Sequence, residues 1–224
     1  MKKNRIDDLF PELKGIPTDK RGRHALDYYR THKGMTRRIM PYLDPLIDST
    51  SRIIEPCVGD GAIRDVIQEW LQAKNYGGAR LFTNDIDRGR EADTHFDATT
   101  VDPYRATGGV NLAITNPPFN AAAAILRAAW DQVETGVAFL LRITWLEPVK
   151  DREALLRDFP LTGFYPFSQP RPSFRLNKHG KKSTDSATTA WIVWDKVRPP
   201  LNRSFIDEEV ARIAFFTNGS KPWN

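Results

Sequence analysis

The pattern of apolar and polar positions along the chain predicts helices that alternate with strands. Apolar residues recur at helical spacing in four stretches: 28–46, 62–72, 120–133 and 150–159. Short apolar runs bounded by turn residues predict strands within 51–55, 79–87, 111–119, 136–146 and 188–197, with another short strand ending at 94–98. Strands that alternate with helices form a mostly parallel sheet covered on both faces, and the last strand suits a closing antiparallel pair at the sheet edge. The sequence therefore predicts an α/β fold.

The composition is ordinary for a globular protein, and it indicates a cellular compartment and a kind of partner. Of the 224 residues, 40% are hydrophobic and 27% are charged. No apolar run approaches the roughly 18 residues of a membrane span, and the first residues lack the apolar core of a secretory signal. The single cysteine, Cys57, excludes an internal disulfide and favours a reducing, cytoplasmic setting. A net charge of +5 and a pI near 9.3 suggest a polyanionic partner.

The chain divides into a main domain and two short appendages. Its length suffices for one α/β core, and we expect this catalytic-sized domain over residues 25–198. Residues 1–24 are polar and basic and predict a loosely ordered arm. Residues 199–224 predict a C-terminal extension whose helix either docks on the domain or forms a dimer contact. The sequence leaves the oligomeric state open between a monomer and a weak dimer.

Polar and turn-forming residues stand where four of the predicted strands end. The first strand runs into a turn with Gly59 and Gly61, which let the backbone approach a ligand closely. The next three strands end at Asp85, Asp97 and Asn116. In an open α/β sheet, ligands bind at these carboxyl ends. Each feature alone is as well explained by a turn or a helix cap, but chance rarely places all four in this order within about sixty residues.

This series resembles the motifs of class I S-adenosylmethionine-dependent methyltransferases. Within that superfamily it is similar to DNA adenine-N6 methyltransferases, including the small, single-chain kind encoded by bacteriophages and prophages. The resemblance covers roughly residues 28–196, and it implies a Rossmann-like fold with a mostly parallel seven-stranded sheet, helices on both faces and a closing antiparallel strand. The motifs that carry it are Glu55-Pro56-x-x-Gly59-x-Gly61, Asp85, Asp97 and, most specifically, Asn116-Pro117-Pro118-Phe119.

The resemblance implies S-adenosyl-L-methionine as the cofactor and assigns its contacts by position. The glycine turn would leave room for the cofactor, Asp85 would accept the ribose hydroxyls, and Asp97 would bind the adenine amino group. The stretch DYYRTHKGMTRRI resembles the family segment that touches the methionine end, although His32 stands where a proline is usual. No metal is implied, and the sequence has no His/Cys cluster with metal-ligand spacing. The implied cofactor contacts are Tyr29, Thr31, Glu55, Pro56, Cys57, Gly59, Gly61, Asp85, Ile86, Asp97 and Asn116.

The tetrapeptide Asn116-Pro117-Pro118-Phe119 supplies the implied catalytic residues. An exocyclic amino nitrogen is a poor nucleophile because its lone pair is delocalised into the ring. If the Asn116 side-chain oxygen and the Pro117 carbonyl each accept one amino hydrogen, the lone pair can turn toward the methyl group, and both dipoles face the positive charge that develops. Phe119 would stack on a base extruded from the duplex. The alternative is a plain strand-terminating turn with Phe119 in the core.

A basic stretch within residues 165–188 predicts a nucleic-acid recognition loop. Its central part, residues 169–184, has no acidic residue and suits contacts to phosphates. The alternative is an ordinary solvated loop. With the chemistry above, this stretch favours double-stranded DNA as the partner, in a bacterial host cytoplasm if the chain is phage-encoded. The predicted contacts are Arg171, Arg175, Lys178, Lys181 and Lys182.

Three functions stay open. The leading one is transfer of a methyl group to adenine N6 in DNA. The second keeps the chemistry on RNA adenine, cytosine N4 or protein glutamine, although Asn116 and Phe119 favour adenine, since cytosine enzymes more often begin the motif with serine and glutamine enzymes usually end it with tyrosine. The third is a non-catalytic nucleic-acid-binding module on the same fold, against which intact Gly59, Asp85 and Asn116 argue.

Overall fold

The computed structural model describes residues 31–147, 152–168, 188–198 and 201. In this part of the chain six strands form one sheet in the order β2-β1-β3-β4-β6-β5. Strands β2, β1, β3 and β4 are parallel, whereas β6 is antiparallel to both β4 and β5. The predicted mostly parallel sheet with a closing antiparallel pair is therefore confirmed. The strands are β1 (Arg52–Glu55), β2 (Arg80–Thr83), β3 (Val110–Thr115), β4 (Val133–Arg142), β5 (Gly163–Pro166) and β6 (Thr189–Asp195).

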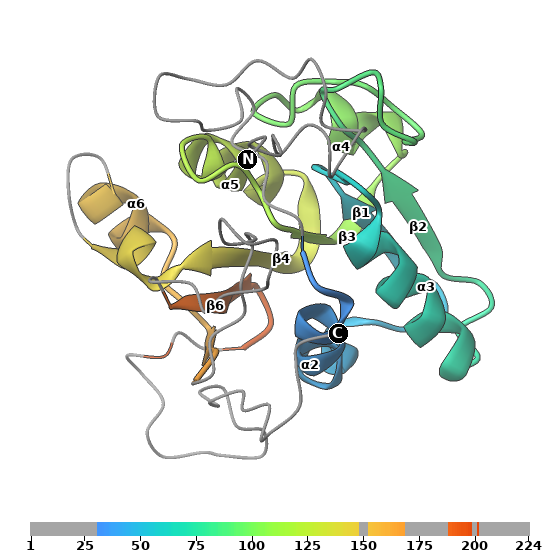
Figure 1. Cartoon of the computed structure of the whole chain (residues 1–224), viewed down its shortest axis with the longest axis horizontal. Coiled ribbons are helices and arrows are strands. Elements are labelled where there is room, and N and C mark those ends of the chain that lie inside the picture. Colours follow the sequence, from blue (N-terminus) through green and yellow to red (C-terminus); the bar gives the residue numbers. More distant parts are fainter. Residues whose placement is uncertain (1–30, 148–151, 169–187, 199–200, 202–224) are drawn as a thin grey trace, which may run out of the picture.

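Helices cover both faces of the sheet (Figure 1). One face carries α2 (Lys33–Leu43) and α3 (Ala62–Ala73), and the other carries α4 (Asp102–Ala106), α5 (Ala122–Trp130) and α6 (Arg152–Asp158). Short 3-10 helices follow α2 and β4: η2 (Asp44–Leu46) and η3 (Ile143–Leu146). The four predicted helical stretches correspond to α2, α3, α5 and α6, whereas the sequence did not predict the short α4.

The alternation of side chains along each strand divides the core into two layers. Ile53 packs in the layer beneath α2 and α3, and its neighbour Ile54 packs in the layer beneath α5 and α6. The same rule predicts that Trp191 and Trp194, three positions apart on β6, point to opposite faces. Both are fully buried, one in each layer, because helices cover both sides of this strand.

The short third strand predicted from the sequence is absent from the described chain, so the sheet there has six strands instead of the expected seven. One isolated parallel bridge joins Asn84 and Thr94 at that place. Side chains make some of the hydrogen bonds that a strand would make with its backbone. The Asp93 carboxylate accepts from the Thr83 amide and hydroxyl at 2.8 and 2.9 Å. The Asn84 side-chain oxygen accepts from the Phe96 amide at 2.9 Å. This segment is thus fixed beside β2 without adding a strand.

The register of the parallel strands brings their carboxyl ends to one edge of the sheet. Glu55 at the end of β1 pairs with Thr83 at the end of β2, and Thr115 at the end of β3 pairs with Phe139 of β4. The loops that follow β1, β2 and β3 therefore lie next to one another. Among the described residues no helix is both long and apolar enough to span a membrane.

Candidate active site

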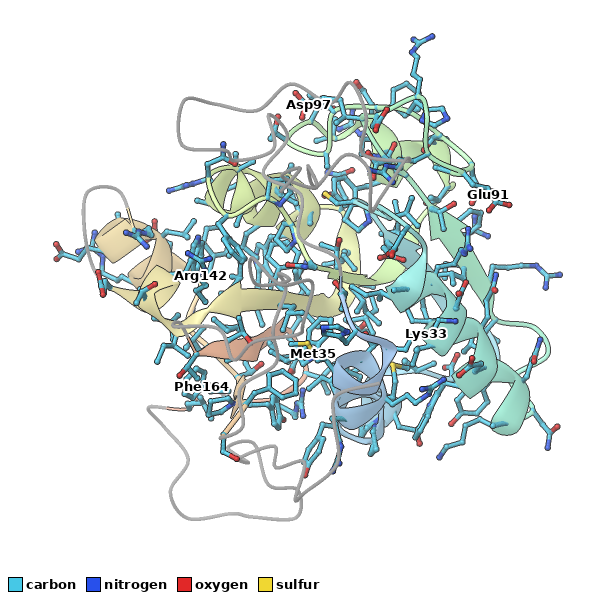
Figure 2. All side chains as sticks on the ribbon, viewed as in Figure 1. Lys33, Met35, Glu91, Asp97, Arg142 and Phe164 are labelled. Atoms are coloured by element: carbon cyan, nitrogen blue, oxygen red, sulfur yellow. The ribbon has the colours of Figure 1, made fainter. Side chains whose placement is uncertain are left out.

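A cavity of about 230 Å³ opens at the carboxyl edge of the parallel strands. Strand β1 lies between β2 and β3, so the chain passes from β1 to its neighbour on one side and then returns to the neighbour on the other side. Open α/β sheets bind ligands at such a reversal of the strand order. Figure 2 shows Asp97 on this side of the molecule, among the loops beyond the strand ends. The wall combines residues from five segments: Thr31 before α2, 55–63 after β1, 85–99 after β2, 116–121 after β3, and Ile125 of α5.

The turn after β1 depends on two glycines. Gly59 and Gly61 have φ angles of 56° and 77°, in the left-handed region that side chains disfavour. A Cβ atom on Gly61 would also lie 2.5 Å from a guanidinium nitrogen of Arg64. The Gly61 amide donates to the Val58 carbonyl at 2.9 Å, and Gly61 is the N-cap of α3. The turn therefore places the Gly59 backbone on the cavity wall with no side chain in front of it.

Asp85 ties the loop after β2 to the glycine turn. One carboxylate oxygen accepts a hydrogen bond from the Gly59 amide at 2.8 Å, and the other accepts from the Asp87 amide at 2.9 Å. Each carboxylate oxygen has a second lone pair, so Asp85 can still accept hydroxyl groups from a ligand in the cavity. The neighbouring Ile86 lies on the same wall and is 54% exposed, which gives a flat ligand an apolar surface beside that carboxylate.

Asn84, directly after β2, joins three loops of the site. It is fully buried. Its side-chain nitrogen donates to the carbonyls of Pro56 and Phe96 at 3.0 and 3.1 Å. Its oxygen accepts from the Thr94 hydroxyl and the Phe96 amide, both at 2.9 Å. Asn84 thus holds the turn after β1 and the segment that leads to Asp97 at fixed positions, a role that the sequence analysis did not assign to it.

Glu55 is a buried carboxyl group on the cavity wall. Its side chain is only 1% exposed, and its Oε2 atom has no hydrogen-bond partner among the described residues. Removal from water raises the pKa of Glu55 well above its ordinary value of 4.5, and it outweighs the opposite effects of a hydrogen bond to the Arg64 backbone and of the Arg64 charge. An unpartnered buried oxygen is unfavourable unless a ligand binds it, so Glu55 fits a ligand that brings a hydrogen-bond donor or a positive charge.

Cys57 is part of the wall and has no features of a nucleophile. Removal from water raises the pKa of the Cys57 thiol, and the Asp85 and Glu55 carboxyls add to the shift. The thiol therefore stays protonated at neutral pH, and it is the thiolate that reacts. The Cys57 carbonyl accepts a hydrogen bond from the hydroxyl of Thr115 at 3.3 Å, which connects the turn after β1 to the end of β3.

Acidic residues dominate the electrostatics of the cavity. Asp60, Asp85, Asp87 and Asp97 lie on the wall, and Arg90 contributes a cation whose guanidinium lies 3.3 Å from Asp87. Such a wall favours a ligand that carries positive charge. Within the described residues, no group of three or more His, Cys, Asp or Glu side chains could hold a metal ion.

Three residues of the tetrapeptide after β3 form another part of the wall. Asn116, Pro117 and Pro118 line the cavity, and Pro117 is buried. The Asn116 side-chain nitrogen donates to the hydroxyl of Thr31 at 3.0 Å. The Pro118 carbonyl accepts from the Ala121 amide at 3.0 Å, which starts the turn into α5. The prolines therefore end the strand, and they place Asn116 on the cavity wall.

Phe119 lies beside the cavity and not on its wall. Its ring is partly buried against the core layer beneath α5 and α6. The guanidinium of Arg142, the last residue of β4, lies 5.2 Å from the centre of this ring, which is within range of a cation–π contact. Figure 2 shows Arg142 near the end of β4. Sequence reasoning missed Arg142, although a cation at the end of the strand next to β3 was a usable signal.

The structure brings most of the candidate site residues together. Eleven of the proposed catalytic and cofactor-binding residues line the cavity: Thr31, Glu55, Pro56, Cys57, Gly59, Asp85, Ile86, Asp97, Asn116, Pro117 and Pro118. Gly61 and Phe119 adjoin it. Tyr29 and the proposed nucleic-acid contacts at 171, 175, 178, 181 and 182 lie outside the described residues, as do the arm over 1–24 and most of 199–224. The proposed recognition loop over 165–188 begins within β5.

Comparison with solved structures identifies the fold. The modification subunit of a protein described as a type I restriction enzyme, from Vibrio vulnificus, matches with a TM-score of 0.58 at 12% identity over 77% of this chain. A protein of Listeria monocytogenes described as a class I S-adenosylmethionine-dependent methyltransferase matches with a TM-score of 0.52 at 11% identity over 80% of it. A type I restriction-modification methyltransferase subunit from Streptococcus thermophilus matches with a TM-score of 0.50 at 16% identity over 76% of this chain.

These likenesses establish the architecture. The chain spans 45%, 63% and 45% of the lengths of these three proteins, in the same order. No protein-family model and no curated protein matches the sequence. The chain therefore has the class I methyltransferase fold, as the resemblance in the sequence implied.

Proposed function

We propose that this chain is an S-adenosylmethionine-dependent methyltransferase that modifies the exocyclic N6 amino group of adenine in DNA. The observation that carries the proposal is one cavity whose wall contains both Asp85 with the Gly59 turn and the Asn116-Pro117-Pro118 segment. Two of the structural neighbours are described as the modification subunit of a type I restriction enzyme and the methyltransferase subunit of a type I restriction-modification system, which supports DNA as the substrate class.

The residues of the wall fit the cofactor. S-adenosylmethionine supplies a methyl group on a positively charged sulfonium, next to an amino acid end and a nucleoside end. Asp85 has lone pairs for the ribose hydroxyls, and Ile86 offers an apolar surface to the adenine. The unpartnered Oε2 of Glu55 suits the ammonium group, and the acidic wall suits the sulfonium charge. Asp97 is exposed at the rim, where it can accept from the adenine amino group.

Asn116 and Pro117 act on the acceptor. The Asn116 side-chain oxygen and the Pro117 carbonyl each accept one hydrogen of the amino group that is methylated. This draws the nitrogen toward tetrahedral geometry and frees its lone pair for in-line attack. The two carbonyl dipoles also stabilise the positive charge that forms on nitrogen during transfer. The rigid proline pair holds both acceptors in place before the base arrives, so little reorganisation is needed.

Phe119 and Arg142 hold the base. A target inside a duplex must leave the stack before its amino group can enter a cavity. The Phe119 ring beside the cavity provides a surface on which the extruded base stacks. Arg142 contacts that ring at 5.2 Å, and its positive charge suits the phosphates of a nucleic acid.

The test is methyl transfer from radiolabelled S-adenosylmethionine to unmethylated duplex DNA, with RNA and bulk protein in parallel. The Asn116→Ala variant is the matched control, because it removes an acceptor and leaves Asp85 and the Gly59 turn unchanged. Label in DNA with the parent protein but not with the variant supports the proposal. Label only in RNA or protein refutes the substrate, and a lack of any transfer by a protein that binds the cofactor refutes the activity.

A further inference from the structure

We propose that Thr31 is a positioning residue for the catalytic asparagine: its hydroxyl fixes which end of the Asn116 amide faces the acceptor base. This rests on the proposed function. The contact that leads to it joins residues 85 positions apart, at 3.0 Å between the Asn116 nitrogen and the Thr31 oxygen.

The orientation of the amide decides whether Asn116 can work. One end of the side chain is an NH2 donor and the other is a carbonyl acceptor, and a half-turn about the last side-chain bond exchanges them. Only the oxygen can accept a hydrogen from an amino group. In the wrong orientation the NH2 group would face the amino hydrogens, donor against donor. A catalytic asparagine therefore needs a neighbour that distinguishes its two ends.

Thr31 is placed to be this neighbour once its own hydroxyl hydrogen is donated to another group. It lies directly before α2, where His32 is the N-cap, and its side chain is 7% exposed. It also lies on the cavity wall together with Asn116. Because the nitrogen end of the amide is directed at Thr31, the oxygen end lies on the other side of the amide group, away from Thr31.

The same hydroxyl can link this orientation to occupancy of the cavity. A threonine hydroxyl donates one hydrogen and accepts through two lone pairs. If a carboxylate bound in the cavity accepts the hydrogen, only lone pairs remain for Asn116, and the amide must present its nitrogen to them. The amino acid end of S-adenosylmethionine carries such a carboxylate. Binding of the cofactor would thus lock the asparagine in the orientation that accepts the base.

Variants of similar shape separate this role from a structural one. Thr31→Val removes the hydroxyl with little change of shape, and Thr31→Ser keeps it. Thr36→Val is the matched control, because Thr36 lies on α2, is fully buried and has an oxygen without a hydrogen-bond partner in the described chain. At saturating cofactor we expect Thr31→Val to lower kcat on DNA by about tenfold to a hundredfold. Thr31→Ser and Thr36→Val should stay within about twofold of the parent, since neither loses this bond.

A spectroscopic readout tests the contact without turnover. In a ¹⁵N–¹H spectrum of side-chain amides, the pair of NH2 signals from Asn116 is identified by its loss in Asn116→Asp. We expect this pair to shift and exchange faster in Thr31→Val and to stay in place in Thr31→Ser. An unchanged kcat in Thr31→Val, or an Asn116 pair that does not move, would overturn the proposal. A parent protein that methylates no DNA refutes the proposed function instead, and the spectrum then still decides whether Thr31 orients Asn116.

Discussion

Replacing Glu55 by glutamine should make the free protein more stable and its cofactor site weaker. Glu55 is 1% exposed, and in the part of the chain that the structure describes one of its oxygens has no hydrogen-bond partner. Burial raises the pKa of this carboxyl well above 4.5. In the unfolded chain the group ionises as the pH rises past 4.5, whereas in the folded protein it keeps its proton until the pH reaches its raised pKa. Every pH unit above 4.5 therefore favours unfolding tenfold, until the pH reaches the raised pKa of the folded state.

The size of the effect follows from that interval. Each pH unit between 4.5 and the raised pKa of the folded state lowers the folding free energy by about 1.4 kcal/mol, and above that pKa the loss stops growing. Glutamine has nearly the same shape and does not ionise, so Glu55→Gln should recover most of this loss at pH 7. Below pH 4.5 both states of the parent protein are protonated, and the difference in stability between parent and variant should lose its pH dependence.

The assay is urea unfolding of both proteins at several pH values between 4 and 8, without cofactor. We expect the midpoint of the variant to exceed that of the parent increasingly as the pH rises, with unchanged slope. Glu69→Gln is the control: Glu69 is exposed, and its ion pair with Arg37 contributes at most about 1 kcal/mol. A stability difference between Glu55→Gln and the parent that does not vary with pH would refute the reasoning.

Three further predictions follow from the site and the sheet. Asn116→Ala should abolish methyl transfer while calorimetry still detects cofactor binding; loss of both together would contradict the division of the wall into a cofactor part and an acceptor part. Asp85→Ala should weaken cofactor affinity by about tenfold or more, because a charged acceptor is lost, and unchanged affinity would remove Asp85 from the ribose role. Gly136→Ala should lower the free energy of unfolding by about 1–3 kcal/mol in urea titrations, because its Cβ would lie 2.4 Å from the Trp194 carbonyl oxygen. Retention of full stability would show that β4 and β6 can separate at this point.

Local pattern was sufficient to predict the sheet and the edge at which the cavity lies. The apolar runs of β1, β3 and β4 are continuous because both of their faces are covered, and such runs can be recognised without any partner. Parallel strands with intervening helices then force the residues after each strand onto one edge. For this reason Asp85 and Asn116, far apart in the chain, could be predicted to share a site.

Contacts between distant side chains could not be predicted in this way. Thr31 was expected to contact a cofactor, but nothing in the local pattern indicates that its hydroxyl contacts Asn116. The predicted third strand failed for a related reason. Asn84 and Asp93 provide from their side chains some of the hydrogen bonds that a strand would provide from its backbone. Propensity and periodicity describe backbone pairing and do not indicate where side chains bond in place of the backbone.

The identity of the methylated nucleoside tests the central claim most directly. DNA modified by the parent protein with S-adenosylmethionine is digested to nucleosides, and these are separated and identified by mass. The account predicts N6-methyladenine from duplex DNA with the parent protein and none with Asn116→Ala. N4-methylcytosine in the DNA, or a methylated product in RNA or protein with none in DNA, would contradict it.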